Sequence, residues 1–394
     1  MAIAFPFVEV SIDTSGLQPE AQRAPGVLAI VGSTGGEGTA DPNTPIVVDD
    51  LSDAVPRFNK LDGSGVPDPE TDLYKALMAA FSQDPRPSKI YAVKLDGTDW
   101  SAGLKALEAA DDVTFVTLAN APVKAGAAGT NDAVSALMSH CVAQSADGNK
   151  RIGVAAVDPE IAKSDTYAAD VIALTTPFKG STPRMVMVAA RGATVEGGAG
   201  VGEVAAAAAS AIAGQPVASS VVMKRVAGFA VPLAKQFSPG EIKALSADGI
   251  IPVIDPVLVA GSSLHFAEGT LYTTDASQRY IDIVRLLDDV EFRLKAGLIG
   301  MIGDARITRG GLASVIRKCE GILGVVETTG AITDFTIQIP VYDALLKPEA
   351  ARSATDTKLI FDARSERLVP MYVTIVIGPA IHRLKIVLQP DFTG

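Results

Sequence analysis

The alternation of short apolar runs with helix-like segments, over roughly the first two-thirds of the chain, most constrains its fold. Apolar runs that predict strands lie at residues 27–31, 46–48, 90–95, 113–118, 152–157, 185–189 and 250–254. Segments with helical spacing or strong helix formers lie at 71–81, 100–110, 132–143, 161–175 and 203–213, and another begins after Ser238. This order is typical of a layered α/β domain.

The pattern changes near Gly261. Two amphipathic helices are expected, one from about Gln278 to Ala296 and one carrying Leu312 to Leu323. Extended segments are then expected at 332–339, 357–361, 369–377 and 381–388. The second part is therefore predicted to be α+β. Residues 1–262 hold 19 Lys and Arg against 29 Asp and Glu, whereas residues 263–394 hold 15 against 16, so the acidity lies in the first part.

Both ends of the chain have the pattern of strands. Residues 3–12 alternate loosely between apolar and polar side chains, and Gly16 to Ala24 form a polar tether. The last candidate strand runs from Ile381 to Leu388. A strand at a terminus must pair with a sheet edge, either in its own domain or in another molecule.

Composition excludes several classes of protein. With 48% hydrophobic and 20% charged residues, the chain has the composition of a globular protein. A net charge of −11 argues against binding to a nucleic-acid backbone. The two cysteines form no CxxC motif, which argues against a disulfide framework or a cysteine zinc site. The start lacks the basic region of a signal peptide, and no apolar run approaches the roughly 18 residues of a membrane span.

The glycine-rich loop from Gly32 to Thr39 is the sharpest indication of an enzyme. A loop of this kind after a strand can hold a nucleotide phosphate. It has no lysine, however, Thr34 occupies the second glycine position of GxGxxG, and Pro42 and Pro45 stand where a helix would begin. A structural turn is favoured, and a nucleotide- or sugar-phosphate-binding α/β enzyme is the alternative.

No other catalytic or metal-binding motif is found. The histidines, at 140, 265 and 382, are scattered, and His140 beside Cys141 lacks a third partner. The acidic pairs at 49–50, 111–112 and 288–289 are typical of solvated faces. We therefore predict no catalytic residue, no cofactor and no metal site.

The order of short motifs along almost the whole chain resembles the contractile tail sheath family of phage tails, R-type bacteriocins and other contractile injection systems. The matching residues are Ala24 to Val27, Val31-Gly32 with the glycine loop, Asn43 to Pro45, Leu51 to Ala54 with Phe58, Leu73 to Phe81, and Ile90 to Lys94. Later matches are Arg279 to Asp282, the helix through Leu294, the helix after Gly310-Gly311, Cys319 to Gly324, and two closing strands.

The resemblance implies four regions. Residues 1–24 would be an N-terminal strand and linker arm, 25–262 an outer α/β domain, 263–378 an inner, tube-facing α+β domain, and 379–394 a C-terminal strand arm. Terminal strands would be exchanged between subunits. The residues expected in this mesh are Ile3, Phe5, Phe7, Val8, Val10, Ile381, Leu384, Ile386 and Leu388. Arg317 and Lys318 are expected on a tube-facing helix.

The function that the resemblance implies is mechanical. Subunits would polymerise as stacked six-fold rings in a helical assembly around a tail tube, and contraction would drive the tube through a cell envelope. The expected partners are other copies of the chain, the tube protein, and the baseplate and tail terminator proteins, with no nucleic acid and no membrane. Assembly would occur in the bacterial cytoplasm, and the product would be a virion tail or a released particle. A homo-oligomeric scaffold unrelated to contraction is a further alternative.

Overall fold

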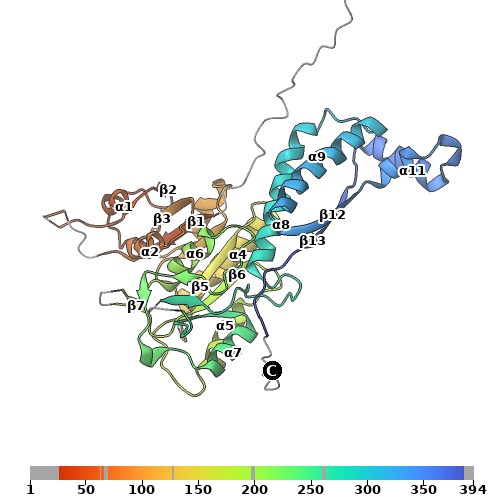
Figure 1. The fold of residues 1–394 in the computed structure, drawn as a ribbon. Coiled ribbons are helices and arrows are strands. Elements are labelled where there is room, and N and C mark those ends of the chain that lie inside the picture. Colours follow the sequence, from red (N-terminus) through yellow and green to blue (C-terminus); the bar gives the residue numbers. More distant parts are fainter. Residues whose placement is uncertain are drawn as a thin grey trace, which may run out of the picture. The chain divides into compact units, whose positions relative to one another are not determined.

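The computed structural model describes residues 26–62, 64–65, 70–126, 128–196, 200–259 and 263–385. These form two compact units (Figure 1). The large unit contains residues 26–289 and 379–385, and the small unit contains residues 290–378. None of the helices in the described part of the chain is long and apolar enough to cross a membrane.

A nine-stranded sheet forms the centre of the large unit. Its order is β2-β3-β1-β4-β5-β6-β10-β11-β8. The six strands from β3 to β10 are parallel, whereas β2, β11 and β8 pair antiparallel at the two sides. The strands are β1 (Val27–Gly32), β2 (Pro45–Val48), β3 (Lys89–Lys94), β4 (Phe115–Leu118), β5 (Ile152–Ala156), β6 (Met185–Ala189), β8 (Arg225–Val226), β10 (Ile250–Ile254) and β11 (Leu264–Phe266). A separate small ladder joins β7 (Thr194–Val195) to β9 (Phe229–Ala230).

Helices cover both faces of this sheet, which explains why its strands are continuous apolar runs. All six residues of β1 are buried, with Leu28 and Ile30 in one core cluster and Ala29 and Val31 in the other. The helices of the large unit are α1 (Leu51–Phe58), α2 (Asp72–Phe81), α3 (Trp100–Lys105), α4 (Ala128–Ala146), α5 (Tyr167–Thr175), α6 (Val204–Gly214), α7 (Pro239–Asp248) and the first half of α8 (Ile281–Leu298).

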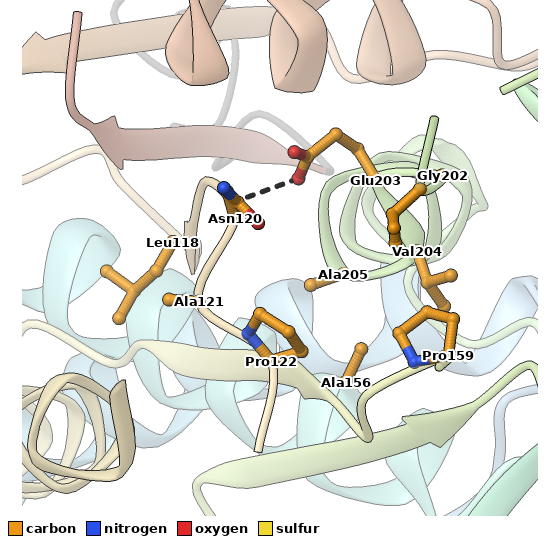
Figure 2. A pocket seen from close by; sticks show the side chains of 11 residues that line it. Leu118, Asn120, Ala121, Pro122, Ala156, Pro159, Gly202, Glu203, Val204 and Ala205 are labelled. Carbon is orange, nitrogen blue, oxygen red and sulfur yellow. Dashed lines mark hydrogen bonds between the residues drawn. The ribbon is translucent and has the colours of Figure 1, made fainter. Parts of the chain in front are cut away.

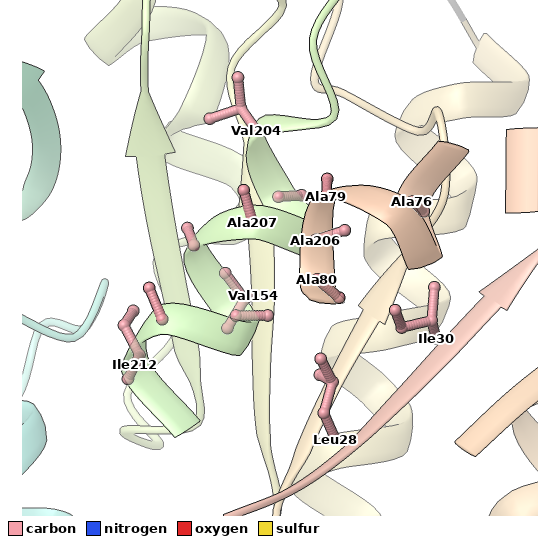
Figure 3. Packing of buried hydrophobic residues seen from close by; sticks show 14 of the residues in the cluster. Leu28, Ile30, Ala76, Ala79, Ala80, Val154, Val204, Ala206, Ala207 and Ile212 are labelled. Carbon is pink, nitrogen blue, oxygen red and sulfur yellow. The ribbon is translucent and has the colours of Figure 1, made fainter. Parts of the chain in front are cut away.

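Helix α6 is buried on every side. Its run of alanines lets α2 approach closely, as Figure 3 shows for Ala206 and Ala207 beside Ala79 and Ala80. Small side chains at such a contact leave no room for a larger residue. The sequence predicted this helix from propensity, and its burial is what requires alanine at so many positions.

The first half of α8 is fixed to the large unit by two arginines. Arg184, just before β6, makes two hydrogen bonds to the Asp288 carboxylate, at 2.6 and 2.9 Å. Arg285 donates to the carbonyl oxygens of Ile212 and Gln215, at 3.1 and 2.8 Å, at the carboxyl end of α6. The guanidinium thereby adds hydrogen bonds at a helix end, where the last carbonyl groups lack the usual intrahelical N–H partners; the Ile212 carbonyl oxygen also accepts from the Gln215 N–H at 3.3 Å.

The small unit is a helical layer with a two-stranded sheet. Its elements are the second half of α8, α9 (Arg309–Thr328), β12 (Ile332–Gln338), α10 (Pro340–Leu346), α11 (Ala354–Glu366) and β13 (Tyr372–Ile377). Strands β12 and β13 pair antiparallel, with Phe335 opposite Ile375 and Gln338 opposite Tyr372. Its one core cluster is small and consists of Leu312, Ile339, Val341, Ala344, Leu345, Ile360 and Ala363. Further apolar side chains are buried along α9 and at the start of β12.

One predicted element is wrong. Residues 357–361, expected to be extended, lie inside α11. The Ser353 hydroxyl and the Asp356 carboxylate form a capping box that starts this helix, and Ile360 and Ala363, three residues apart, bury one face of it. The predicted capping box of α7, by contrast, is confirmed at Ser238 and Glu241. The large sheet also extends past residue 262, because it includes β11.

Candidate assembly surface

The glycine-rich loop after β1 is held as a tight turn. Gly35, Gly36 and Gly38 have φ values of +62°, +88° and +80°, which favour glycine. A Cβ atom on Gly38 would lie 2.2 Å from the carbonyl oxygen of Arg57. The Lys94 ammonium donates to the Gly38 carbonyl oxygen at 3.0 Å. Gly38 therefore serves close packing against the end of α1, whereas Gly35 and Gly36, with nothing within 4 Å of a Cβ atom, supply the positive φ angles of the turn that the structural interpretation predicted.

Two of the amide groups that could bind a phosphate are already occupied. At the start of α2, the Leu73 N–H donates to the Ser33 carbonyl oxygen at 3.1 Å, and the Tyr74 N–H donates to the Thr71 hydroxyl at 3.3 Å. Asp72 adds a carboxylate to this first turn. A phosphate would have to displace these bonds and meet a negative charge.

Two carboxylates lie at the edge where the parallel strands end, and Figure 2 shows one of them, Glu203, beside Asn120. The Asn120 N–H donates to Glu203 Oε2 at 3.1 Å, and the Asn120 side-chain amide donates to Asp72 Oδ2 at 3.1 Å. Burial raises the pKa of Glu203 to about 7, and the negative charge of Asp72 adds to this effect. Open α/β sheets usually bind ligands at this edge. Here it holds two acidic side chains joined through one asparagine, which disfavours an anionic ligand.

The His140 and Cys141 pair is structural. His140 Nε2 lies 2.8 Å from Arg151 Nη1, and burial together with the arginine charge lowers the pKa of His140 to about 4. Burial raises the pKa of the Cys141 thiol to about 12. A neutral histidine beside a protonated, enclosed thiol is not a nucleophile pair. Within the described residues, no group of three or more His, Cys, Asp and Glu side chains could hold a metal ion.

The strands β12 and β13 present open edges. Along the described chain each of them pairs with the other alone, so each has one side without a ladder partner. An isolated two-stranded sheet is marginally stable, and its unpaired N–H and C=O groups are a template for a further strand. On one face Phe335, Ile337, Val373 and Ile375 are half-buried, whereas Tyr372 and Val376 are exposed on the other.

Exposed apolar side chains are concentrated in the small unit. Eight large apolar residues are exposed among its 89 residues, against six in residues 26–289 of the large unit, which is about three times as long. The eight are Ile299, Ile302, Val325, Leu346, Phe361, Leu368, Tyr372 and Val376. This density of exposed apolar side chains, together with the open strand edges, makes the small unit the candidate assembly surface. Sequence periodicity predicted the two strands but not that their outer edges lack partners.

The other predicted site residues are placed as follows. Arg317 and Lys318 are exposed on α9, and Cys319 beside them is buried, so both charges point away from the core. Ile381 and Leu384 are 83% and 78% exposed, and residues 381–385 form no strand within the single chain. Ile3, Phe5, Phe7, Val8, Val10, Ile386 and Leu388 lie outside the described residues.

Comparison with known proteins identifies the fold. No family model and no curated protein matches this sequence. The structure matches the anti-feeding prophage helical sheath in its contracted state, with 13% identity, a TM-score of 0.65, and coverage of 99% of this chain and 100% of that chain.

Two further solved structures agree. The contracted sheath complex of the extracellular contractile injection system PVC matches with 13% identity and a TM-score of 0.69, covering 100% of this chain and 99% of that chain. A sheath tail protein from Listeria innocua matches with 11% identity and a TM-score of 0.57, covering 81% of this chain and 89% of that chain. The chain therefore has the fold of contractile sheath proteins.

Proposed function

We propose that this chain, which has the fold of contractile sheath proteins over its whole length, is the structural subunit of a contractile tail sheath. The observation that carries the proposal is the two-stranded sheet of the small unit, whose outer edges have no partner among the described residues. A sheet of this kind becomes stable when further strands extend it.

The ends of the chain supply strands of suitable length. Residues 3–12 and the segment that begins at 381 have the sequence pattern of strands, and β12 and β13 are seven and six residues long. Each chain has two terminal arms and two open edges. In a lattice where every subunit donates two arms and receives two, every interior edge is paired. Main-chain hydrogen bonds between subunits would then hold the lattice together.

In this proposal the subunits stack as six-fold rings around a tail tube, between a baseplate and a terminator. The region 25–262 faces outward with the rest of the large unit, and within the region 263–378 the small unit faces the tube, with Arg317 and Lys318 directed toward it. Contraction is a rigid-body rearrangement of subunits that remain linked by the arms of residues 1–24 and 379–394. The assembled product is a phage tail, a bacteriocin or another injection particle made in a bacterial cell.

Negative-stain electron microscopy of the purified protein tests this proposal. We expect hollow striated tubes from the intact chain. Deletion of residues 1–12 should leave a folded protein that forms no tubes. Without the N-terminal strand, one of the two open sheet edges of each neighbouring subunit would remain unpaired. A chain in which a twelve-residue Gly/Ser segment replaces residues 1–12 controls for the length of the arm.

Two results would count against the proposal. Discrete particles of the intact chain that bind labelled nucleotide would favour the phosphate-binding alternative. Normal tubes from the deletion variant would show that the proposed strand at residues 3–12 is not needed for assembly.

A further inference from the structure

The beginning of the C-terminal arm is docked on the large unit of its own chain. His382 Nε2 lies 2.8 Å from the Ser220 hydroxyl oxygen. The His382 ring packs edge-to-face on the Tyr280 ring, with centroids 5.0 Å apart and planes at 83°. Arg383 Nη2 lies 3.9 Å from Glu268 Oε1. Two consecutive residues of the arm thus contact three residues that are far from them in sequence.

Two of these three residues are held in place by bonds within the large unit. Tyr280 bridges to Thr270, and the Ile281 N–H donates to the Gly269 carbonyl oxygen at 3.1 Å. The Ser220 hydroxyl accepts a hydrogen bond from the Val222 N–H at 3.2 Å. Backbone bonds therefore hold this receiving surface in place independently of the arm.

The chemistry of the contact is polar and aromatic. The Glu268 side chain is only 10% exposed, and Arg383, 86% exposed, brings a positive charge to it. The neighbouring apolar residues Ile381 and Leu384 are 83% and 78% exposed, so the receiving surface does not bury them. Specific polar contacts with little apolar burial fix the position of a segment more than they add to stability.

We propose that Ser220, Glu268 and Tyr280 form a receiving site that anchors the C-terminal arm on its own subunit at His382 and Arg383, so that a second copy takes only the residues after Lys385. The inference rests on the proposed sheath function for the identity of the partner. It restricts the exchanged segment to residues 386–394, whose fully extended length is about 30 Å.

This anchor changes which residues are expected in the mesh. Pro390 has no N–H to donate, so the run from Ile386 to Gln389 is the part of the arm suited to a ladder. Ile386 and Leu388 remain candidates for pairing on a neighbour. Ile381 and Leu384 lie on either side of the anchored pair. They belong instead to the root of the arm, which is the part of the arm up to Lys385 that stays on its own subunit.

Crosslinking of the unassembled protein tests the anchor without any tube. A variant with Ser219→Cys and Ile381→Cys, next to the contacting residues Ser220 and His382 and leaving both of these intact, is prepared in natural-abundance and ¹⁵N-labelled forms, mixed in equal amounts, and treated with a bis-maleimide. We expect linked peptides that join the two positions with both halves carrying the same isotope. The Ile381→Cys single variant measures background links to Cys141 and Cys319, which are both buried.

The crosslinking result has clear alternatives. Linked peptides with mixed isotopes at about half of the total, the statistical share for exchanged chains, would show that the root itself is exchanged and would overturn the anchor. Absence of any linked peptide above the background would overturn it as well. Neither result depends on whether the protein forms a sheath.

A pair of matched variants tests the boundary in the assembled state. Ile386→Ser with Leu388→Ser should lower the yield of tubes at least about tenfold, because apolar contacts of the exchanged strand are lost. Ile381→Ser with Leu384→Ser should leave the yield within about twofold, because these side chains already face solvent in the free chain. Equal losses from both pairs would overturn the proposed boundary. If the intact chain forms no tubes, the sheath proposal fails, while the crosslinking result still decides the anchor.

Discussion

The two units of this chain differ in how completely they bury their apolar side chains and strand edges. The large unit encloses a sheet between helices on both faces, with two extensive core clusters. The small unit has one core cluster of seven residues, with further buried apolar side chains along α9, and it leaves two strand edges and eight large apolar side chains exposed. The large unit covers its sheet on both faces, whereas the small unit leaves strand edges open, and the proposed sheath would cover these edges with strands from partners.

Charge follows the same division. Residues 24–289 carry 20 Lys and Arg against 31 Asp and Glu, whereas residues 290–378 carry 11 against 10. A strong net charge keeps a surface solvated and disfavours contact between copies. A nearly neutral surface with exposed apolar residues favours such contact. In the proposed sheath, adhesion between subunits is therefore assigned to the small unit.

The largest effect on stability is expected from a substitution in the core of the large unit. Ala207→Leu places a larger side chain where α6 contacts α2, and overpacking of this kind costs about 1–3 kcal/mol or more. Chemical denaturation followed by circular dichroism measures the loss. Ala102→Leu on α3, at a partly exposed position, is the matched control. Equal stability of Ala207→Leu and the control would mean that the α2–α6 contact is looser than the structure shows.

In the small unit, a substitution on a strand should affect assembly rather than stability. Val376→Lys puts a charge on an exposed position of β13, a substitution that discourages strand addition. We expect a thermal midpoint within about 2 °C of the original, because the monomer buries little there, and a loss of tubes. Ser365→Lys, exposed on α11, adds the same charge away from the strands. Loss of tubes in both variants would point to general repulsion between copies rather than to the edge.

A smaller effect is expected from Glu203, whose pKa in the folded protein is raised from 4.5 to about 7. The folded state binds the proton more tightly than the unfolded state, so this group stabilises the fold fully below about pH 4.5, and that stability is lost as the pH rises through about 7. Glu203→Gln removes the charge. It should raise the midpoint at pH 8 by about 2–4 °C relative to the original protein, and by less at pH 5.

Scanning calorimetry measures the thermal midpoint of the variant and of the original protein at each pH, and the two midpoints are compared. The exposed carboxylate of Glu160, changed to glutamine, serves as control. A constant difference across the pH range would show that Glu203 is ionised at all these pH values.

The smallest effect is expected on α9. Arg317→Glu with Lys318→Glu changes two exposed charges and should leave the fold intact, while tube-dependent assembly weakens several-fold and more so at low salt. Lys358→Glu with Arg364→Glu on α11 makes the same change of charge elsewhere in the small unit. If both pairs weaken assembly equally, net charge rather than a tube-facing position of α9 explains the result.

Local patterns predicted most of the elements. The central strands follow from continuous apolar runs, and α7 follows from its Ser238 cap. The run Leu359 to Phe361 suggested a strand, but the Ser353–Asp356 capping box starts a helix before it. Helix α1 was not predicted, since it is eight residues long and contains Pro56.

Long-range features could not be predicted from the same patterns. The Asn120 bonds join it to residues 83 and 48 positions away, and the anchor of His382 joins it to a residue 162 positions away. An unpaired strand edge leaves no mark on periodicity, because pairing depends on what lies beside a strand. The candidate surface therefore became visible only with the sheet order.

The most direct test of the account is a cryo-electron microscopy reconstruction of tubes formed by the intact chain. The account predicts that β12 and β13 lie inside a wider sheet, with a strand from a neighbouring subunit paired along each outer edge. Tubes in which both edges remain bare, with subunits joined only through the large unit, would contradict it.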